Sequence, residues 1–171
     1  MKIGKLLAAT ALVCSSAAVL MAPVGTAQAY QYQCAQPELE AAGSFTVETQ
    51  GPNFLFQISE DLCFINLPAT FIFEGDLEGS FSSDFHIAHF GACDQPAFEI
   101  FWTKGTYEGS VLGGEGTFDY NFQGTIVDNF ADGTLFVKPG SGTDELEDLS
   151  GYFSLSGISG VSGDYEGSVD L

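Results

Sequence analysis

The sequence predicts an all-β fold, and three observations favour an eight-stranded antiparallel β-barrel. Apolar and polar residues alternate with a period of two over much of residues 44–171, as in strands that bury one face. No segment of that region has the pattern of an amphipathic helix of useful length, which excludes parallel strands joined by crossover helices. A five-residue motif also recurs, and its central glycine suits strands that bend around a closed barrel.

Residues 1–29 are predicted to be a signal peptide, so we expect a secreted or periplasmic protein. Lys2 and Lys5 form a positive start, residues 6–21 are apolar apart from small polar residues, and residues 27–29 match the small-x-small cleavage pattern. The apolar stretch is short for a membrane span, and no later segment approaches the ~20 consecutive apolar residues that a span needs. We therefore expect no insertion into a membrane.

The barrel domain is expected at residues 44–171, after a polar lead-in at residues 30–43. Its longest alternating run is Phe71–Ile87, which is too long for one straight strand, so Gly75 and Gly79 are expected to mark bends or bulges. Gly, Pro, Asn and Asp clusters separate the other strands. These strands are predicted at Ser44–Thr49, Asn53–Ser59, Ala97–Lys104, Tyr107–Leu112, Gly116–Ile126, Thr134–Lys138, Gly151–Ser156 and Asp164–Leu171.

The recurring motif places glycines on the inner face of the predicted barrel. The sequence Tyr-Glu-Gly-Ser-Val occupies residues 107–111 and again 165–169, and residues 77–81 are a near copy. With the apolar residues of the motif inward, each central glycine also points inward and each glutamate outward. The glycines either let the strands coil or open a cavity, and the sequence leaves both alternatives open. Such a cavity would be lined by Phe73, Phe81, Tyr107, Phe118, Tyr120 and Tyr165.

The charge balance excludes polyanionic partners. The chain has 23 Asp and Glu residues against four Lys and Arg, a formal net charge of −19. After residues 1–29 only Lys104 and Lys138 remain, and binding to a phosphate backbone requires many cations. Nucleic acid and anionic membrane surfaces are therefore excluded. All 16 Phe, all six Tyr and the one Trp follow residue 29, an aromatic content typical of a folded domain.

Three cysteines, Cys34, Cys63 and Cys93, follow the predicted signal peptide. In an oxidising compartment they predict one disulfide and one remaining thiol. The sequence leaves all three pairings open, and we favour Cys63 with Cys93 because this bridge would tie a strand to the loop at residues 89–96. No Cys-x-x-Cys motif is present, so no metal site is expected at the cysteines.

Two titratable residues, Glu99 and His89, are candidates for acid–base chemistry. Glu99 lies between Phe98 and Ile100, where burial would raise its pKa, although a glutamate on a strand more often faces solvent. His89 precedes a loop and follows His86 by three residues, an offset that puts the two on opposite faces of a strand. Neither residue belongs to a recognisable catalytic motif, so the sequence does not decide whether the protein is an enzyme.

Other polar features point to binding at the surface. Lys104 is a third weak catalytic candidate, and it shares a strand face with Trp102, where the two are candidates to frame the mouth of a cavity. Acidic clusters at residues 128–133 and 144–148 are candidates for weak calcium binding, although neither matches the twelve-residue calcium loop. No cofactor is expected, and assembly into a homo-oligomer is left open.

The segment Pro139–Leu146 together with Leu149–Gly151 resembles a family signature. It is similar to the Gly-Ser-Gly-Thr-(Gly)-Glu-Leu…Leu-x-Gly pattern of a bacterial family of unknown function, whose barrel is of the allene oxide cyclase type and is also similar to plant dirigent proteins. Residues 73–79 and 113–118 resemble two further segments of that family. The resemblance implies an eight-stranded barrel and permits a cavity for a small ligand.

The chain departs from that family in one respect that bears on function. Members usually carry an arginine in the Gly-Gly turn and a Glu-Arg pair in the preceding strand, whereas this chain has Glu115 in the turn and no arginine after residue 29. No catalytic residue can therefore be carried over from the resemblance, and a shared fold does not establish a shared function.

The sequence leaves three functions open. The first is binding of a small, largely apolar molecule in the barrel interior, by the six aromatic residues above together with Trp102. The second is an isomerase or cyclase that folds a reactive substrate inside the same cavity. The third is a structural or surface-associated domain whose interior is filled by its own side chains.

Overall fold

The computed structural model describes residues 38–50 and 54–171 of the 171-residue chain. The predicted signal peptide at residues 1–29 and Cys34 lie outside the described residues. Within the described part, the one helical element is a short 3-10 helix, η1 (Asp144–Leu146). No helix in this part is long and apolar enough to cross a membrane.

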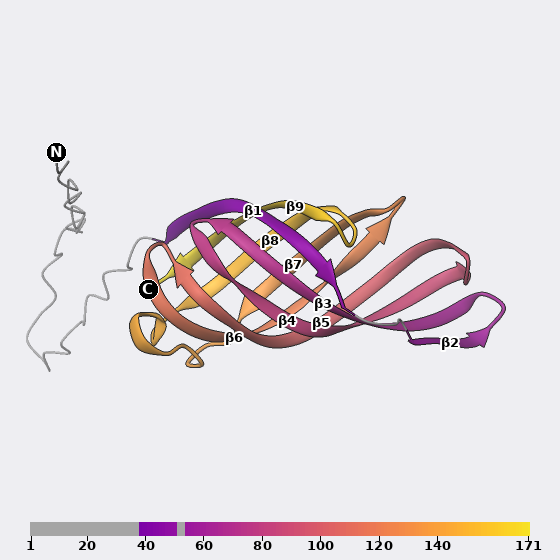
Figure 1. Cartoon of the computed structure of the whole chain (residues 1–171), viewed down its shortest axis with the longest axis horizontal. Coiled ribbons are helices and arrows are strands. Elements are labelled where there is room, and N and C mark those ends of the chain that lie inside the picture. Colours follow the sequence, from indigo (N-terminus) through magenta and orange to yellow (C-terminus); the bar gives the residue numbers. More distant parts are fainter. Residues whose placement is uncertain (1–37, 51–53) are drawn as a thin grey trace, which may run out of the picture. The chain divides into compact units, whose positions relative to one another are not determined.

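Nine antiparallel strands make up the rest of the described chain (Figure 1). They form because the two-residue alternation of apolar and polar side chains gives each of them one face that can be buried. The strands are β1 (Leu39–Thr49), β2 (Phe54–Ser59), β3 (Leu62–Gly75), β4 (Leu77–Ala92), β5 (Gln95–Val111), β6 (Gly114–Val127), β7 (Phe130–Val137), β8 (Ser150–Ile158) and β9 (Ser162–Asp170).

Eight of these strands close into a barrel, which confirms the predicted fold class. The strand order is β1-β9-β8-β7-β6-β5-β4-β3-β2, and β1 also pairs with β3, so the ring closes without β2. β2 pairs only with the first residues of β3 and is an outer strand. Closure pairs both edges of the eight-stranded sheet, whereas β2 is paired on one side only among the described strands, and its other edge is free.

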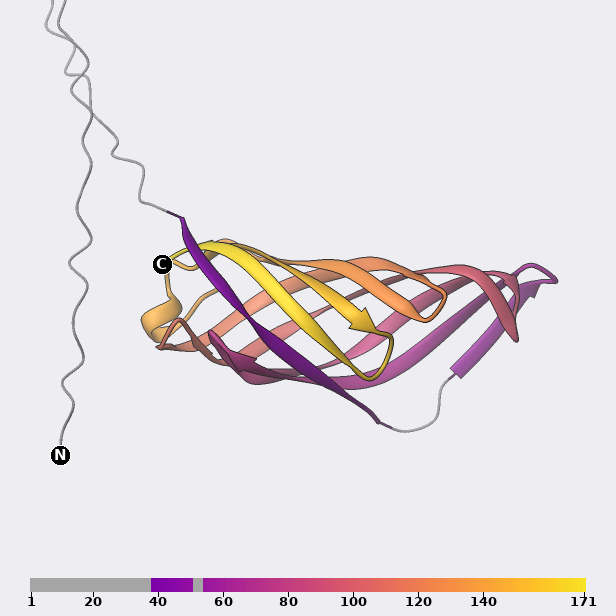
Figure 2. The ribbon, with the colours of Figure 1, turned by 90° about the horizontal axis from the view of Figure 1, so that it is seen from above.

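β2 and the adjoining ends of β3, β4 and β5 project beyond one end of the barrel (Figures 1 and 2). We call residues 54–66 and 86–100 the extension, and the barrel end from which they project the mouth. The opposite end, where the β3–β4 and β5–β6 turns and η1 lie, is the closed end. The extension continues the barrel wall, so one of its faces continues the inner face of the barrel.

Three predicted boundaries differ from the structure. The run Phe71–Ile87 is two strands rather than one bent strand, because Gly75 has a positive φ of 114° and forms a tight turn between β3 and β4. Conversely, the strands predicted at Ala97–Lys104 and Tyr107–Leu112 are one strand, β5. β1 begins at Leu39, so strand pairing extends into the segment that the sequence suggested was a lead-in.

Aromatic rings fill the closed end of the barrel. The glycines of the recurring motif face inward as predicted, but a Cβ atom built on Gly79 would lie 2.7 Å from the Tyr107 Oη, and one on Gly109 would lie 2.9 Å from it. Tyr107 in turn stacks on Phe118, with ring centroids 4.8 Å apart. The nearest atoms to these two Cβ positions are the backbone carbonyl oxygens of Glu108 and Glu78, so the glycines make room for close strand approach as well as for the tyrosine side chain. The residues packed here include Phe73, Phe81, Tyr107, Phe118, Tyr120 and Tyr165, all of them buried.

Candidate functional site

An apolar pocket opens at the mouth of the barrel, at the end opposite the filled core. Its cavity volume is about 60 Å³, and its wall comes from β1, from β3 to β8 and from the β8–β9 turn. Successive side chains of a strand point to opposite faces, and on each strand the lining residues occupy the alternate positions that face the barrel interior. The main lining side chains are Phe45, Phe71, Phe85, Phe101, Phe122 and Leu155.

Packed phenylalanine rings form the floor of this pocket. Phe71 stacks on Phe85 with a centroid distance of 5.3 Å and on Phe81, of the closed end, at 4.9 Å. Phe101 meets Phe122 edge to face at 5.1 Å. Edge-to-face and offset stacks of this kind are the favoured arrangements of aromatic rings, so the floor is a stable layer. It separates the pocket from the packed closed end.

His89 and Glu99 lie together on the inner face of the extension, just beyond the rim of the pocket. The strand register places Cys63 opposite His89, His89 opposite Glu99, and Glu99 opposite Ile126, which itself lines the pocket. His89 Nε2 is 2.9 Å from Glu99 Oε1, and the two side chains are only 9% and 15% exposed. The structure therefore brings two of the predicted catalytic candidates together at the edge of an apolar cavity.

The electrostatics of this pair are unusual for a surface strand. Burial raises the pKa of the Glu99 carboxyl above its ordinary value, and the neighbouring His89 opposes that rise. Among the described residues neither ring nitrogen of His89 has a hydrogen bond of good geometry, although Nε2 lies within ion-pair distance of Glu99. Such a pair can exchange a proton or bind the polar group of a ligand.

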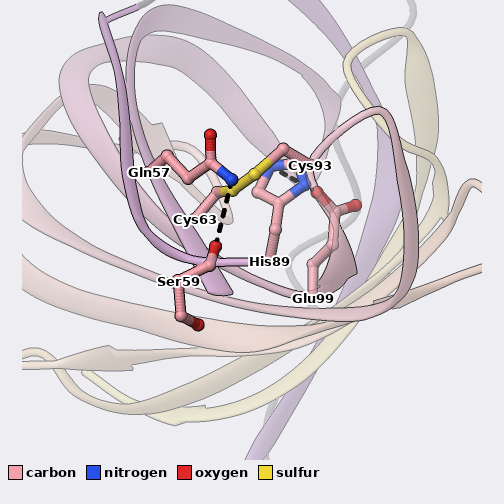
Figure 3. Close-up of a disulfide and its surroundings, with 6 residues drawn as sticks. All are labelled: Gln57, Ser59, Cys63, His89, Cys93 and Glu99. Carbon is pink, nitrogen blue, oxygen red and sulfur yellow. Dashed lines mark hydrogen bonds and ion pairs between the residues drawn. A yellow bond between two sulfur atoms is a disulfide. The ribbon is translucent and has the colours of Figure 1, made fainter. Parts of the chain in front are cut away.

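A disulfide between Cys63 and Cys93 stands beside the pair, as Figure 3 shows. This is the favoured pairing among the three that the sequence left open. The two Cα atoms are 5.7 Å apart, within the usual range for a bridged pair. It joins the start of β3 to the β4–β5 turn across 30 residues, and therefore ties the two parts of the extension to each other. The Gln57 amide also donates to the Ser59 carbonyl, at 3.2 Å.

The remaining predicted site residues lie elsewhere. Phe73, Phe81, Tyr107, Phe118, Tyr120 and Tyr165 belong to the packed closed end and do not line the pocket. Trp102 and Lys104 are on the outer face of β5, because the inward positions there are Phe101 and Thr103. They line a groove on the outside of the barrel rather than the mouth of an inner cavity.

The sequence missed most of the pocket-lining residues. Phe45 and Phe122 were placed in strands, but nothing in the alternation shows at which end of a barrel an inward side chain lies. The missing information was the register between strands, which sets each residue's height along the barrel axis. The long β7–β8 connection was one signal of which end of the barrel is covered. It carries two apolar residues, Leu146 and Leu149, and both are fully buried at the closed end.

The predicted acidic clusters do not form a metal centre in the described part of the chain. No group of three or more His, Cys, Asp or Glu side chains is arranged there to hold a metal ion. Asp128 and Asn129 form the β6–β7 turn with positive φ angles, and Asp144 begins η1. These acids thus have local structural roles at turns, where Asp and Asn are favoured.

Comparison with known proteins agrees with this architecture. The family model described as a protein of unknown function, DUF3224, matches residues 41–166. The chain belongs to the DUF3224 family. A crystal structure of another DUF3224 protein of unknown function, from Shewanella oneidensis MR-1, is similar with a TM-score of 0.65 and 22% identity, covering 78% of this chain and 97% of that one. None of the curated proteins matches this DUF3224 chain.

Proposed function

We propose that the protein binds a small, largely apolar molecule at the mouth of the barrel, between the pocket and the inner face of the extension. The observation that supports this proposal is the apolar pocket with the largely buried pair His89 and Glu99 just beyond its rim. Ligand sites are commonly concave, apolar and equipped with a few polar groups, and the mouths of β-barrels are a common place for them.

The size of the pocket limits how such a molecule would lie. A cavity of about 60 Å³ has the volume of roughly two water molecules, whereas a cavity that holds benzene measures about 150 Å³. Only the end of an alkyl chain or a small branched group fits without displacing a side chain. The rest of the molecule would lie along the extension, against Ile87 and Ile126, with its polar group near Glu99.

The test is the binding of a neutral apolar dye that carries a long alkyl chain, 6-dodecanoyl-2-(dimethylamino)naphthalene, followed by its fluorescence. Ala131 lines the pocket from β7, so Ala131→Trp would fill the mouth and lower dye affinity more than about tenfold. Asp132→Trp is the matched control, because the next position of the same strand points outward. Equal binding by both variants, or no saturable binding by the wild type, would overturn the proposal and favour a domain with a filled interior.

An isomerase or cyclase is the second candidate function, and the contact between His89 and Glu99 is what favours it. A carboxyl whose pKa is raised by burial, beside an imidazole, is suited to moving a proton on a bound substrate. The two functions differ in what Glu99→Gln does. An enzyme would convert one of the molecules in a host extract as the wild type and would fail to convert it as Glu99→Gln, whereas a binding protein would leave the extract unchanged in either form, as mass spectrometry of the extract would show.

We also propose that the protein is exported and that its barrel is of the allene oxide cyclase type. The disulfide supports export, because disulfides persist in oxidising compartments. The eight-stranded antiparallel closure and the inward glycines support the barrel type. Mass spectrometry of the protein expressed in its own host would show whether residues 1–29 are removed.

A further inference from the structure

A second concave site lies on the outside of the barrel, over β4, β5, β6 and β7. We call it the outer groove. It is lined by aromatic, amide, hydroxyl and charged side chains, and it shares only Phe122 with the apolar pocket at the mouth. Trp102 and Lys104, which the sequence singled out, both line it. The outer groove is thus a separate feature with different chemistry.

The barrel wall is interrupted beneath this groove. β4 and β5 are paired from Leu77 to Ser80 and again from His86 onward, with no ladder pairs between those two stretches. Side chains bridge the gap instead: the Ser83 and Thr103 hydroxyl oxygens are 2.6 Å apart, Ser83 donates to the Lys104 carbonyl at 2.8 Å, and Thr103 donates to the Asp84 carbonyl at 2.9 Å. Hydroxyl groups therefore take the place of backbone hydrogen bonds in the floor of the groove.

A buried tyrosine hydroxyl lies under the same gap. Tyr120 is 2% exposed, and its Oη has no hydrogen bond of good geometry to any described residue. The strand partner of Tyr120 is Gly105, on β5 at the gap, and a Cβ built on Gly105 would be 2.8 Å from the Tyr120 Oη. The Ser83 side chain is near enough to this hydroxyl to lower the Tyr120 pKa that burial raises, so the core and the floor of the groove meet at the gap.

Two exposed aromatic rings flank the groove. Trp102 on β5 is 40% exposed and Phe136 on β7 is 44% exposed. β6 runs between them and carries Gln123 opposite Trp102 and Asn121 opposite Phe136. Strands are about 4.8 Å apart, so the two rings are about 10 Å or more apart across the sheet. Neither amide group has a hydrogen bond to another described residue, so both are free to bind a ligand.

The charges around the groove favour a neutral ligand. Lys104 and His86 bring basic groups, and Asp84 brings one carboxylate, while the chain as a whole has a net charge of −19. A polyanion would be repelled by this overall charge, and a purely apolar ligand would leave the amides and hydroxyls of the groove without partners.

We propose that the outer groove binds a neutral oligosaccharide of hexopyranose units. A pyranose ring has one face of C–H groups, which stacks on an aromatic ring, and a rim of hydroxyls, which both donate and accept hydrogen bonds. Trp102 and Phe136 are far enough apart to stack on two different rings of one chain. Asn121 and Gln123 lie between them to bind the ring hydroxyls, and Lys104 lies on the same face.

The intrinsic fluorescence of Trp102 provides a direct test, because this is the one tryptophan of the chain. The probes are the hexaoses of β-1,4-glucan, β-1,4-xylan, chitin, β-1,3-glucan and α-1,4-glucan, each titrated to about 10 mM, a range in which millimolar affinity is visible. At least one of the hexose-based probes should change the fluorescence saturably. Isothermal titration calorimetry then compares variants on the probe that binds.

Trp102→Ala and Phe136→Ala should each weaken binding more than about tenfold, as expected for aromatic anchors. Phe98→Ala is the matched control, because Phe98 is an exposed aromatic residue on the same strand and the same outer face, outside the groove. Circular dichroism shows whether each variant is folded. The proposal is overturned if no hexose-based probe binds, if Phe98→Ala weakens binding as much as Trp102→Ala, or if unrelated peptides perturb Trp102 as strongly as the oligosaccharides do.

Discussion

Replacing Tyr165 by phenylalanine tests how the closed end is held together. Tyr165 Oη accepts a hydrogen bond from the Leu77 N–H at 2.6 Å and donates one to the Glu74 carbonyl at 3.3 Å. Leu77 is fully buried, so its N–H has no water to bind once the hydroxyl is gone. Tyr165→Phe keeps the ring, which packs edge to face on Phe73 and Phe153. The substitution therefore removes hydrogen bonds without opening a cavity.

The expected loss follows from the unpaired Leu77 N–H. A buried donor left without a partner costs about 1–3 kcal/mol, and the longer bond to Glu74 adds little, so we expect a loss of about 2 kcal/mol. For a domain of this size, 1 kcal/mol lowers the Tm by about 3–5 °C, and the Tm of Tyr165→Phe should fall by about 6–10 °C. Burial raises the pKa of Tyr165, so the phenol is neutral near pH 7 and the effect should not depend on pH there.

Urea and thermal unfolding measure this loss, with Tyr107→Phe as the matched control. Tyr107 Oη donates to the Ser110 carbonyl at 3.0 Å, and its removal leaves an acceptor rather than a buried N–H. We expect the control to lose about 1 kcal/mol or less. If Tyr165→Phe were no less stable than Tyr107→Phe, the assignment of Tyr165 as the partner of the β3–β4 turn would be refuted.

Three further predictions concern the glycines, the Glu99 carboxyl and the disulfide. Gly79→Ala should destabilise the protein by about 1–3 kcal/mol in urea unfolding because its Cβ would overlap the Glu108 carbonyl oxygen of the paired strand and the Tyr107 hydroxyl. Gly114→Ala, whose Cβ would meet its nearest atom at 3.5 Å, should be nearly neutral, and equal losses would contradict the packing. Burial raises the pKa of Glu99 above 4.5 in the folded protein, so this carboxyl stays protonated to a higher pH in the folded protein than in the unfolded chain. The contribution of Glu99 to stability therefore falls as the pH rises from 4.5 through the raised pKa. Glu99→Gln should remove this decline in urea titrations between about pH 4 and pH 8, and an unchanged difference between the two proteins across that range would contradict the burial. Reduction of the bridge between Cys63 and Cys93, which closes a loop of 30 residues, should lower the free energy of unfolding by about 3–4 kcal/mol, and identical urea curves with and without reductant would show that the bridge does not constrain the chain.

Much of the fold could be predicted from the sequence because β-strands impose a two-residue period. The alternation across Phe71–Ile87 identified the inward side chains correctly, since Phe73 and Leu77 on either side of the turn are both buried. The same alternation could not distinguish a bend from a hairpin, because a short turn returns the chain with the same face inward. The turn depends on the φ angle of Gly75, which a period cannot encode.

The candidate site was only partly predictable. Glu99 and His89 were named from their local surroundings, and their contact depends on the register between β4 and β5, which brings residues ten apart in sequence to opposite positions. The aromatic lining was predicted because the motif glycines suggested empty space inside the barrel, and the structure places those residues at the closed end. In the structure Tyr107 and Tyr165 occupy that space, and a glycine in the sequence does not show whether a ring from another strand covers it.

The central claim is that the mouth of the barrel binds a small, largely apolar molecule. Native and denaturing mass spectrometry of the protein expressed with residues 1–29 in its own host tests it most directly. The account predicts a discrete extra mass in the native spectrum of the wild type, which disappears on denaturation and is absent from Ala131→Trp. A bare protein mass for the wild type, or the same extra mass on Ala131→Trp, would contradict it.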